Sequence, residues 1–335
     1  MTMEGRIAKR RQLLMFAGAS ALSPAFAIAA TEPKHVIWLG PQPKGQERIR
    51  QAFKARGLVD GRDLKLTFLD LPTNNEKEGD ELAESVIRSR PDIIVLIAHA
   101  TLWMLQKRTR DIPVVFYNMG FDPAVVGLVK SLARPGGNLT GSTLGFEDLW
   151  LKNWQLLKEL MPSLKRAGAL VDKRTFEELE RPDHPFALQW ERGRRLKEFA
   201  EQQLGIKIVE LRVPKNATVD DVARIVGSSG VEAAYLDPYT TDVAAKFLLS
   251  AKIPAMCLGN FGVKNGFVLG AGWDWMEGEN YAVDVTQRLL RGESPAVIPV
   301  YQIKKWDIFL NRRRARELGL MIPESMVLLA KEVYD

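Results

Sequence analysis

The residues best suited to bind a small charged molecule are polar side chains that directly follow predicted strands. Asp237 opens the run Asp-Pro-Tyr-Thr after the apolar segment 233–236, and Asp122 follows another apolar run. Either carboxylate could pair with an ammonium group. Thr101 and Thr240 stand where helices are expected to begin, so their hydroxyls and the free amides of those helix ends could hold a carboxylate. These residue types suit a small solute that carries a carboxylate and an ammonium group.

Ligands of open α/β sheets bind just beyond the carboxyl ends of the strands, and this rule selects the candidate ligand contacts. They are Pro41, Gln42, His99, Thr101, Asn118 and Asp122 in the first part of the chain, and Asp172, Asp237, Tyr239, Thr240, Asn260 and Trp273 in the second. Tyr239, Trp273 or Trp275 could stack on a flat or apolar ligand. Structural alternatives exist: Asp122 and the threonines are of types that cap turns and helices, His99 could be satisfied within its loop, and both tryptophans could pack in a core.

No catalytic or metal-binding motif stands out. The three histidines are far apart, and none has the spacing of a metal site such as His-Glu-x-x-His. The first strand ends in Gly-Pro-Gln-Pro (40–43), whose prolines cannot donate amides to a pyrophosphate. We therefore expect no metal, no cofactor and no catalysis. A secreted α/β enzyme remains an alternative, because catalytic triads can be spread through a sequence.

The first thirty residues have the order of a secretory signal. A basic head that contains Arg10 and Arg11 precedes a short apolar core at 13–22, and two Ala-x-Ala cleavage sequences lie within 25–29. We expect cleavage near residues 27–30 and a mature chain that is free in the periplasm. The Arg10-Arg11 pair resembles a twin-arginine signal, and an ordinary Sec signal is the alternative.

Apolar strand-like runs alternate with helical patterns along the whole chain. The first set of strands is expected at 35–40, 64–69, 92–98 and 114–118, and the second at 167–171, 206–213, 233–236, 254–258 and 267–269. An amphipathic helix over 147–161 separates the two sets, and Thr218 with Asp221 fits a capping box at a later helix. Two successive sets of strands and helices predict two α/β lobes with parallel sheets.

Composition agrees with a soluble globular protein of two lobes. About 305 residues would remain after cleavage, which is enough for two domains of ordinary size. Four Lys or Arg and one Glu precede residue 28, so the net charge falls from +6 to +3 on cleavage, too mild to indicate nucleic-acid binding. The single cysteine, Cys257, excludes an intrachain disulfide and is expected to be a small core residue.

Several segments resemble a family of ABC-transporter substrate-binding proteins with the type I periplasmic binding fold, in the branch associated with aromatic amino acid uptake. The specific blocks are DPAVVGLVKSLARPGGNLTG (122–141) and the C-terminal segment 292–335, and weaker similarity is found at 151–162 and 52–66. The sequence departs from the family pattern at 265–275 and at 298–303, where Tyr301 replaces a common acid. These departures affect the expected identity of the ligand and leave the expected fold unchanged.

The resemblance implies two Rossmann-like lobes joined by a three-strand hinge. Lobe 1 would comprise 31–141 and 273–297, and lobe 2 would comprise 142–272 and 298–335, with crossings near 139–144, 270–273 and 295–300. The implied function is that of a monomeric periplasmic component of an ABC importer, which captures a small solute, an amino acid or related carboxylate, by hinge closure. Its partner would be a permease in the inner membrane. A periplasmic sensor that signals to a membrane receptor is the alternative.

Overall fold

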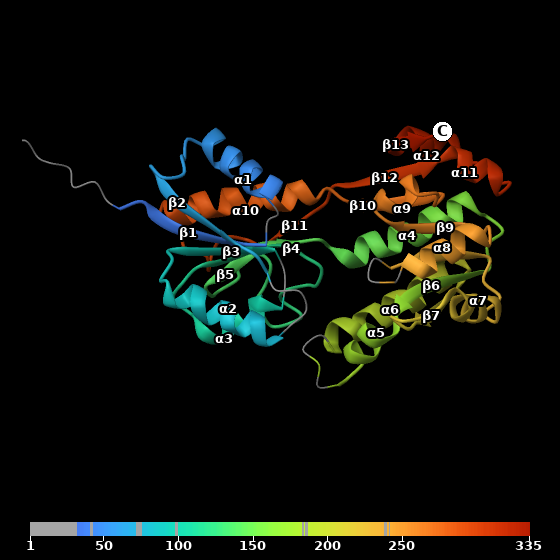
Figure 1. The fold of residues 1–335 in the computed structure, drawn as a ribbon, viewed down its shortest axis with the longest axis horizontal. Coiled ribbons are helices and arrows are strands. Elements are labelled where there is room, and N and C mark those ends of the chain that lie inside the picture. Colours follow the sequence, from blue (N-terminus) through green and yellow to red (C-terminus); the bar gives the residue numbers. More distant parts are fainter. Residues whose placement is uncertain are drawn as a thin grey trace, which may run out of the picture. The chain divides into compact units, whose positions relative to one another are not determined.

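The computed structural model describes residues 32–40, 43–71, 76–97, 100–182, 184, 187–237, 240 and 242–335 (Figure 1). The expected signal segment, residues 1–30, lies outside the described residues. Residues 33–335 form one compact unit that contains two β-sheets. We call each sheet, together with the helices that pack on it, a lobe.

The first sheet is entirely parallel and has helices on both faces. Its strand order is β11-β5-β4-β3-β1-β2. The strands are β1 (Lys34–Leu39), β2 (Leu64–Leu69), β3 (Ile93–Ile97), β4 (Val114–Met119), β5 (Leu139–Thr143) and β11 (Tyr301–Gln302). Helices α1 (Pro43–Ala55) and α10 (Trp275–Leu290) cover one face, and α2 (Glu76–Arg88) and α3 (Thr101–Arg108) cover the other. Burial on both faces explains why these strands are nearly continuous apolar runs.

The second sheet has the order β13-β12-β10-β9-β8-β6-β7. Its strands are β6 (Arg166–Asp172), β7 (Lys207–Val213), β8 (Ala233–Leu236), β9 (Ala255–Leu258), β10 (Leu269–Trp273), β12 (Trp306–Asn311) and β13 (Ala330–Tyr334). Strand β12 runs antiparallel to β10, and β13 pairs with β12 in parallel. The sequence predicts parallel strands only. The difference arises because the chain enters β12 at the edge where β10 ends.

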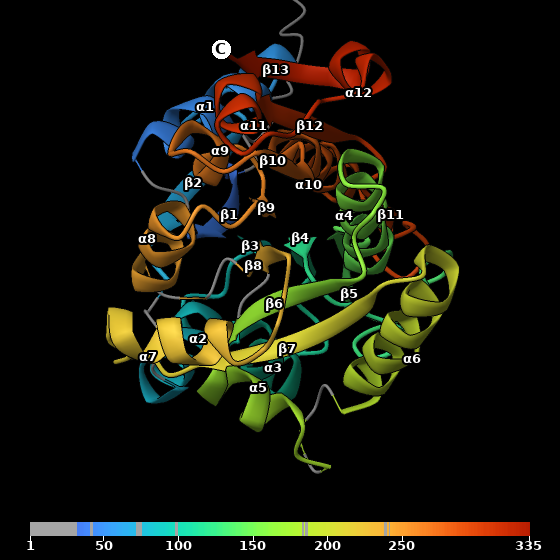
Figure 2. The same cartoon turned by 90° about the vertical axis from the view of Figure 1, so that its right-hand side faces the viewer.

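Helices also cover both faces of the second sheet. Helices α4 (Phe146–Leu160), α6 (Ala187–Leu204), α11 (Arg312–Glu317) and α12 (Glu324–Leu329) surround one core, and α7 (Val219–Gly227), α8 (Asp242–Ser250) and α9 (Phe261–Lys264) surround the other. Figure 2 shows α4 and α6 on one side of β6 and β8, with α7 and α8 on the opposite side. The short α5 (Lys173–Leu179) follows β6. The predicted capping box of Thr218 and Asp221 is confirmed at the start of α7.

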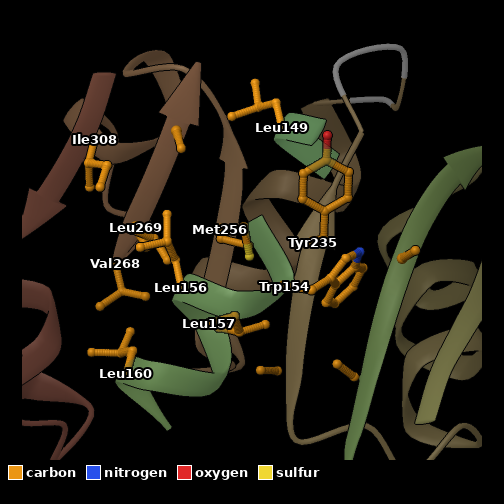
Figure 3. Packing of buried hydrophobic residues seen from close by; sticks show 14 of the residues in the cluster. Leu149, Trp154, Leu156, Leu157, Leu160, Tyr235, Met256, Val268, Leu269 and Ile308 are labelled. Atoms are coloured by element: carbon orange, nitrogen blue, oxygen red, sulfur yellow. The ribbon is translucent and has the colours of Figure 1, made fainter. Parts of the chain in front are cut away.

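Trp154 of α4 anchors the larger core of the second lobe (Figure 3). Its indole is fully buried, and its ring centroid lies 5.9 Å from that of Tyr235 on β8. Leu157 and Leu160 of the same helix pack beside it. The spacing that predicts an amphipathic helix over 147–161 is therefore the spacing of the residues that bury α4 against its sheet.

Three short segments connect the two lobes. The chain leaves β5 through Leu144–Gly145 into α4, leaves β10 through Asp274 into α10, and leaves β11 through 303–305 into β12. The third crossing differs from the prediction at 295–300, because Tyr301 and Gln302 pair with Ser142 and Thr143 of the first sheet. A two-residue strand has no periodic pattern that sequence reasoning could detect.

Candidate ligand-binding site

The carboxyl-end edges of both sheets lie at the crossings. Strand β5 ends at the carboxyl edge of the first sheet, and its two-residue link to α4 spans at most about 11 Å between the flanking residues. Strand β10 ends at the carboxyl edge of the second sheet and continues through the single residue Asp274 into α10. The loops that follow the parallel strands of the two lobes therefore face a common region, where ligands of open α/β sheets bind.

The carboxylate of Asp122, in the loop after β4, accepts hydrogen bonds from three residues. Its Oδ1 accepts hydrogen bonds from the backbone amides of Ala124 (2.9 Å) and Val125 (3.4 Å), which is the turn-capping role expected as the alternative to ligand contact. Its Oδ2 lies 3.2 Å from Nη1 of Arg192 on α6. Asp122 thus belongs to a contact between lobes that the sequence did not predict.

Arg192 joins two carboxylates from different lobes. Its Nη2 lies 3.2 Å from Oε2 of Glu147, in the first turn of α4, while its Nη1 reaches Asp122. Gln189, one turn earlier on α6, donates to Glu147 (2.8 Å) and accepts from the backbone amide of Asp122 (3.3 Å). In the sequence, Arg192, Arg194 and Arg195 form a local basic run, which is typical of a solvated helix face. The bridge was not predictable because its acidic partners come from distant segments.

Replacing Arg192 by Met is expected to lower the free energy of unfolding by at most about 1 kcal/mol at low salt, because the guanidinium is 40% exposed. The difference from wild type should vanish near 1 M NaCl, where the screening length falls to about 3 Å. Urea unfolding at both salt concentrations measures it. Arg195→Met is the control, since Arg195 is 70% exposed and pairs with Glu191 of the same helix. An equal loss at both salt concentrations would contradict a solvent-screened bridge.

Two further candidate ligand contacts of the first lobe, Thr101 and Asn118, are buried against neighbouring helices. Thr101 is fully buried at the start of α3, and its Oγ1 would lie 3.3 Å from a Cβ placed on Gly79 of α2. Asn118, at the end of β4, is 6% exposed and donates from Nδ2 to the Trp275 carbonyl oxygen (3.0 Å). Pro41, Gln42 and His99 lie outside the described residues.

Three candidates of the second lobe make local hydrogen bonds. Asp172 is the N-cap of α5 and accepts from the amide of Thr175 at 2.8 Å. The hydroxyl of Thr240 donates to the Leu170 carbonyl oxygen at 2.9 Å, so its single proton is not directed to a ligand. The amide of Asp237 donates to the same carbonyl at 3.0 Å, which sets the carboxylate at the carboxyl end of β8. Tyr239 lies outside the described residues.

The aromatic residues near the crossings divide into buried and exposed ones. Trp273 is 5% exposed, and its ring centroid lies 5.9 Å from that of Phe146 and 6.0 Å from that of Trp275. Trp275 itself is 46% exposed, and Phe261, directly after Asn260 at the end of β9, is 76% exposed. Trp273 therefore packs as a core residue here, and the exposed rings follow the adjacent strands β9 and β10.

In the described part of the chain, open cavities lie against the crossings. One, of about 400 Å³, is lined by Asp274, Glu277, Tyr281, Tyr301 and Lys305 among others. The other, of about 260 Å³, is lined by Leu144, Trp273, Gln302, Ile303 and Trp306 among others. In the first, the Tyr301 hydroxyl donates to Oε1 of Glu277. This hydrogen bond raises the pKa of Tyr301 to about 12.

Among the described groups, the pKa values that shift most belong to tyrosine and cysteine side chains that stay protonated at neutral pH. Burial raises the pKa of Tyr117 to about 12 and that of Cys257 to about 11, so both keep their protons at neutral pH. They lie in different cores, on opposite lobes. Within the described ranges, no three His, Cys, Asp or Glu side chains gather where they could hold a metal ion.

Comparison with known proteins assigns the chain to a family. A family model described as ABC transporter substrate binding protein matches residues 44–334. The chain belongs to this family of ABC transporter substrate-binding proteins. The resemblance of the sequence blocks is thereby confirmed, and membership implies a small-molecule ligand and an ABC permease as partners. No helix among the described residues is long and apolar enough to cross a membrane.

Relatives of this substrate-binding protein match it over most of their length. The tyrosine-binding protein of Clostridioides difficile (strain R20291) is 23% identical over 287 residues, which are 83% of this chain and 77% of the relative. An ABC domain from Streptococcus pneumonia in complex with L-Trp superposes with a TM-score of 0.70 at 22% identity and covers 90% of this chain and 99% of that chain. A ligand-free, open substrate binding protein with adhesive properties from Clostridium difficile superposes with a TM-score of 0.68 at 20% identity, with the same coverage.

Proposed function

We propose that this substrate-binding protein captures an L-amino acid with an aromatic side chain and passes it to its permease chemically unchanged. The observation that carries the proposal is the pair of exposed rings, Phe261 and Trp275, at the ends of the adjacent strands β9 and β10. Exposed aromatic side chains of this size favour a partner that covers them, at roughly 25 cal/mol per Å² of apolar surface removed from water. The tyrosine-binding relative and the relative in complex with L-Trp support the same ligand class.

The charged groups of an amino acid would find partners at other strand ends. Asp237, at the carboxyl end of β8, would pair with the ammonium group. The backbone amides at the starts of α3 and α8 would hold the carboxylate, since the first amides of a helix have no partner within the helix. The threonine hydroxyls contribute less in this proposal, because Thr101 is buried and Thr240 donates to Leu170.

Binding would close the two lobes about the three crossings. Each crossing contains only one to three residues, so a change of backbone angles at few positions moves one lobe relative to the other. A ligand that contacts both lobes stabilises the closed state by its difference in affinity for the closed and open states. The permease would then recognise the closed state.

The proposal includes a periplasmic location, a cleaved N-terminal signal, a monomeric state and the absence of catalysis. Mass measurement of the protein recovered from the periplasmic fraction would test cleavage near residues 27–30. Light scattering after size exclusion would test the monomeric state. Mass spectrometry of the solute recovered after incubation would test catalysis, and an altered solute would contradict a binding function.

Thermal-shift measurements test the ligand class. L-tyrosine, L-tryptophan and L-phenylalanine are expected to raise the melting temperature, because ligand at one hundred times its Kd adds about 2.7 kcal/mol of stability. D-Glucose and acetate serve as controls, since neither has both an ammonium group and an aromatic ring. Stabilisation by the sugar and none by the aromatic amino acids would contradict the proposed ligand class.

A further inference from the structure

Asn118 has a backbone conformation that is unusual for a residue other than glycine. Its φ is +55°, in the left-handed region, and the pairing of β4 with β5 shifts register between Phe116 and Met119. Asparagine tolerates this region better than most side chains, yet such a conformation still costs on the order of 1 kcal/mol. Buried residues hold it only where several contacts fix it, so the contacts of Asn118 indicate what the strain serves.

Asn118 contacts segments next to two of the crossings directly and approaches the third through Gly278. Its backbone amide donates to Oγ of Ser142 (3.2 Å), two residues before the first crossing. Its Nδ2 donates to the carbonyl oxygen of Trp275 (3.0 Å), the residue after the second crossing. Its Oδ1 is buried, has no hydrogen-bond partner among the described residues, and faces Gly278 of α10, which in turn faces Ile303 at the third crossing.

Position 278 has room only for glycine, because Asn118 lies too close for a side chain there. A Cβ at position 278 would overlap Oδ1 of Asn118 and would lie 2.9 Å from its Cγ and 2.9 Å from Cδ1 of Ile303. Any other residue at 278 must displace the Asn118 amide or the Ile303 side chain. Glycine inside a helix costs roughly 1 kcal/mol relative to alanine, so its presence here is explained by the close approach of Asn118.

The segment after Asn118 is tied to the first crossing and leads into the candidate site. The carbonyl oxygen of Met119 accepts from the amide of Leu144 (2.8 Å) and from Oγ1 of Thr143 (2.9 Å). The same hydroxyl lies 3.1 Å from the carbonyl oxygen of Phe121. Residues 119–121 are therefore joined to the first crossing and to the residue before it by short hydrogen bonds.

We propose that Asn118 is a positioning residue that couples the loop 119–122 at the ligand site to the three connections of the hinge. The inference rests on the proposed function in taking this loop as ligand-facing. Asn118 does not need to touch the ligand. Its side chain would hold α10 against the end of β4, so that binding at the loop and rotation at the hinge occur together.

The test is a double-substitution cycle at Asn118 and Gly278. Asn118→Gly keeps the left-handed backbone conformation accessible and removes the side-chain amide. Gly278→Ala instead places a Cβ where it overlaps Oδ1 of Asn118. Gly193→Ala is the matched control, since a Cβ on this helical glycine of α6 meets no atom within 4 Å. The readouts are the affinity for L-tryptophan by calorimetry and, without ligand, amide hydrogen exchange in the peptide that contains 119–122.

Each single substitution is expected to weaken L-tryptophan binding by about tenfold, in line with the loss of one buried hydrogen bond, and to speed exchange at 119–122. The double variant Asn118→Gly with Gly278→Ala should lose only about tenfold, like Asn118→Gly alone, instead of the roughly hundredfold expected of two independent losses, because the overlapping amide is absent. If Gly278→Ala behaves like Gly193→Ala, or is equally harmful with and without Asn118, the coupling is refuted. If the wild type binds no aromatic amino acid, the proposed ligand class is wrong. The coupling is then tested by hydrogen exchange at 119–122 in the same variants.

Discussion

Replacing both Phe261 and Trp275 by alanine is expected to weaken binding of aromatic amino acids by about 100-fold and to leave unfolding nearly unchanged. Burying one aromatic side chain contributes roughly 1.5–3 kcal/mol, and each 1.4 kcal/mol is a factor of ten in Kd. Stability should be retained because the two side chains are 76% and 46% exposed. Calorimetric titration of L-tryptophan and L-tyrosine measures the loss.

The control for this pair is Phe199→Ala. Phe199 is 49% exposed but lies on α6, away from the ends of β9 and β10, so its removal should not change affinity. Separate Phe261→Ala and Trp275→Ala variants distinguish their contributions, since Trp275 also contacts Trp273 edge to face. Wild-type affinity in the double variant would remove both rings from the ligand site.

Gly141→Ala is expected to destabilise the first lobe by about 3–5 kcal/mol. Gly141 lies in β5 with φ at +152°, and a Cβ there would overlap the Phe116 carbonyl oxygen. It would also lie 2.7 Å and 2.9 Å from the carbonyl carbon and nitrogen of Phe116, which are backbone atoms that no rotamer change can move. Overpacking and backbone strain each cost about 1–3 kcal/mol. Thermal and urea unfolding measure the change.

Gly137→Ala, four residues earlier, is the matched control. A Cβ at Gly137 meets no atom within 4 Å, so this variant should be as stable as the wild type or slightly more stable. Equal stability of the two variants would show that the pairing of Phe116 with Gly141 tolerates a side chain, which would contradict the close approach of β4 and β5.

Local patterns were enough to predict most elements of the fold. The spacing of Trp150, Trp154 and Leu157 predicts a helix, and α4 has that helix with Trp154 in the core. The Thr218–Asp221 capping box is also a local signal, because both partners lie within one turn. Strand β11 had no such signal: it has two residues and exists only because β5 is available as a partner.

The candidate site was harder to predict than the fold, because its contacts join distant segments. Asp122 and Arg192 are 70 residues apart, and Asn118 and Trp275 are 157 residues apart. The capping role of Asp122 could be expected from the following proline and the turn, whereas its pairing with Arg192 required the second lobe. Likewise, exposure distinguishes Trp275 from Trp273, although the two indoles are nearly adjacent in sequence.

The sequence by itself determined the alternation of strands and helices, the two-lobed α/β class and the family, because these depend on periodicity and on contiguous blocks of residues. Only the tertiary structure decided which polar groups are already engaged and which aromatic rings are exposed. It also showed that Asn118 donates hydrogen bonds beside two crossings and faces Gly278, which faces Ile303 at the third. The physical reason is that hydrogen-bond partners and burial depend on distant chain segments that the crossings bring together. A local sequence pattern does not predict these long-range contacts.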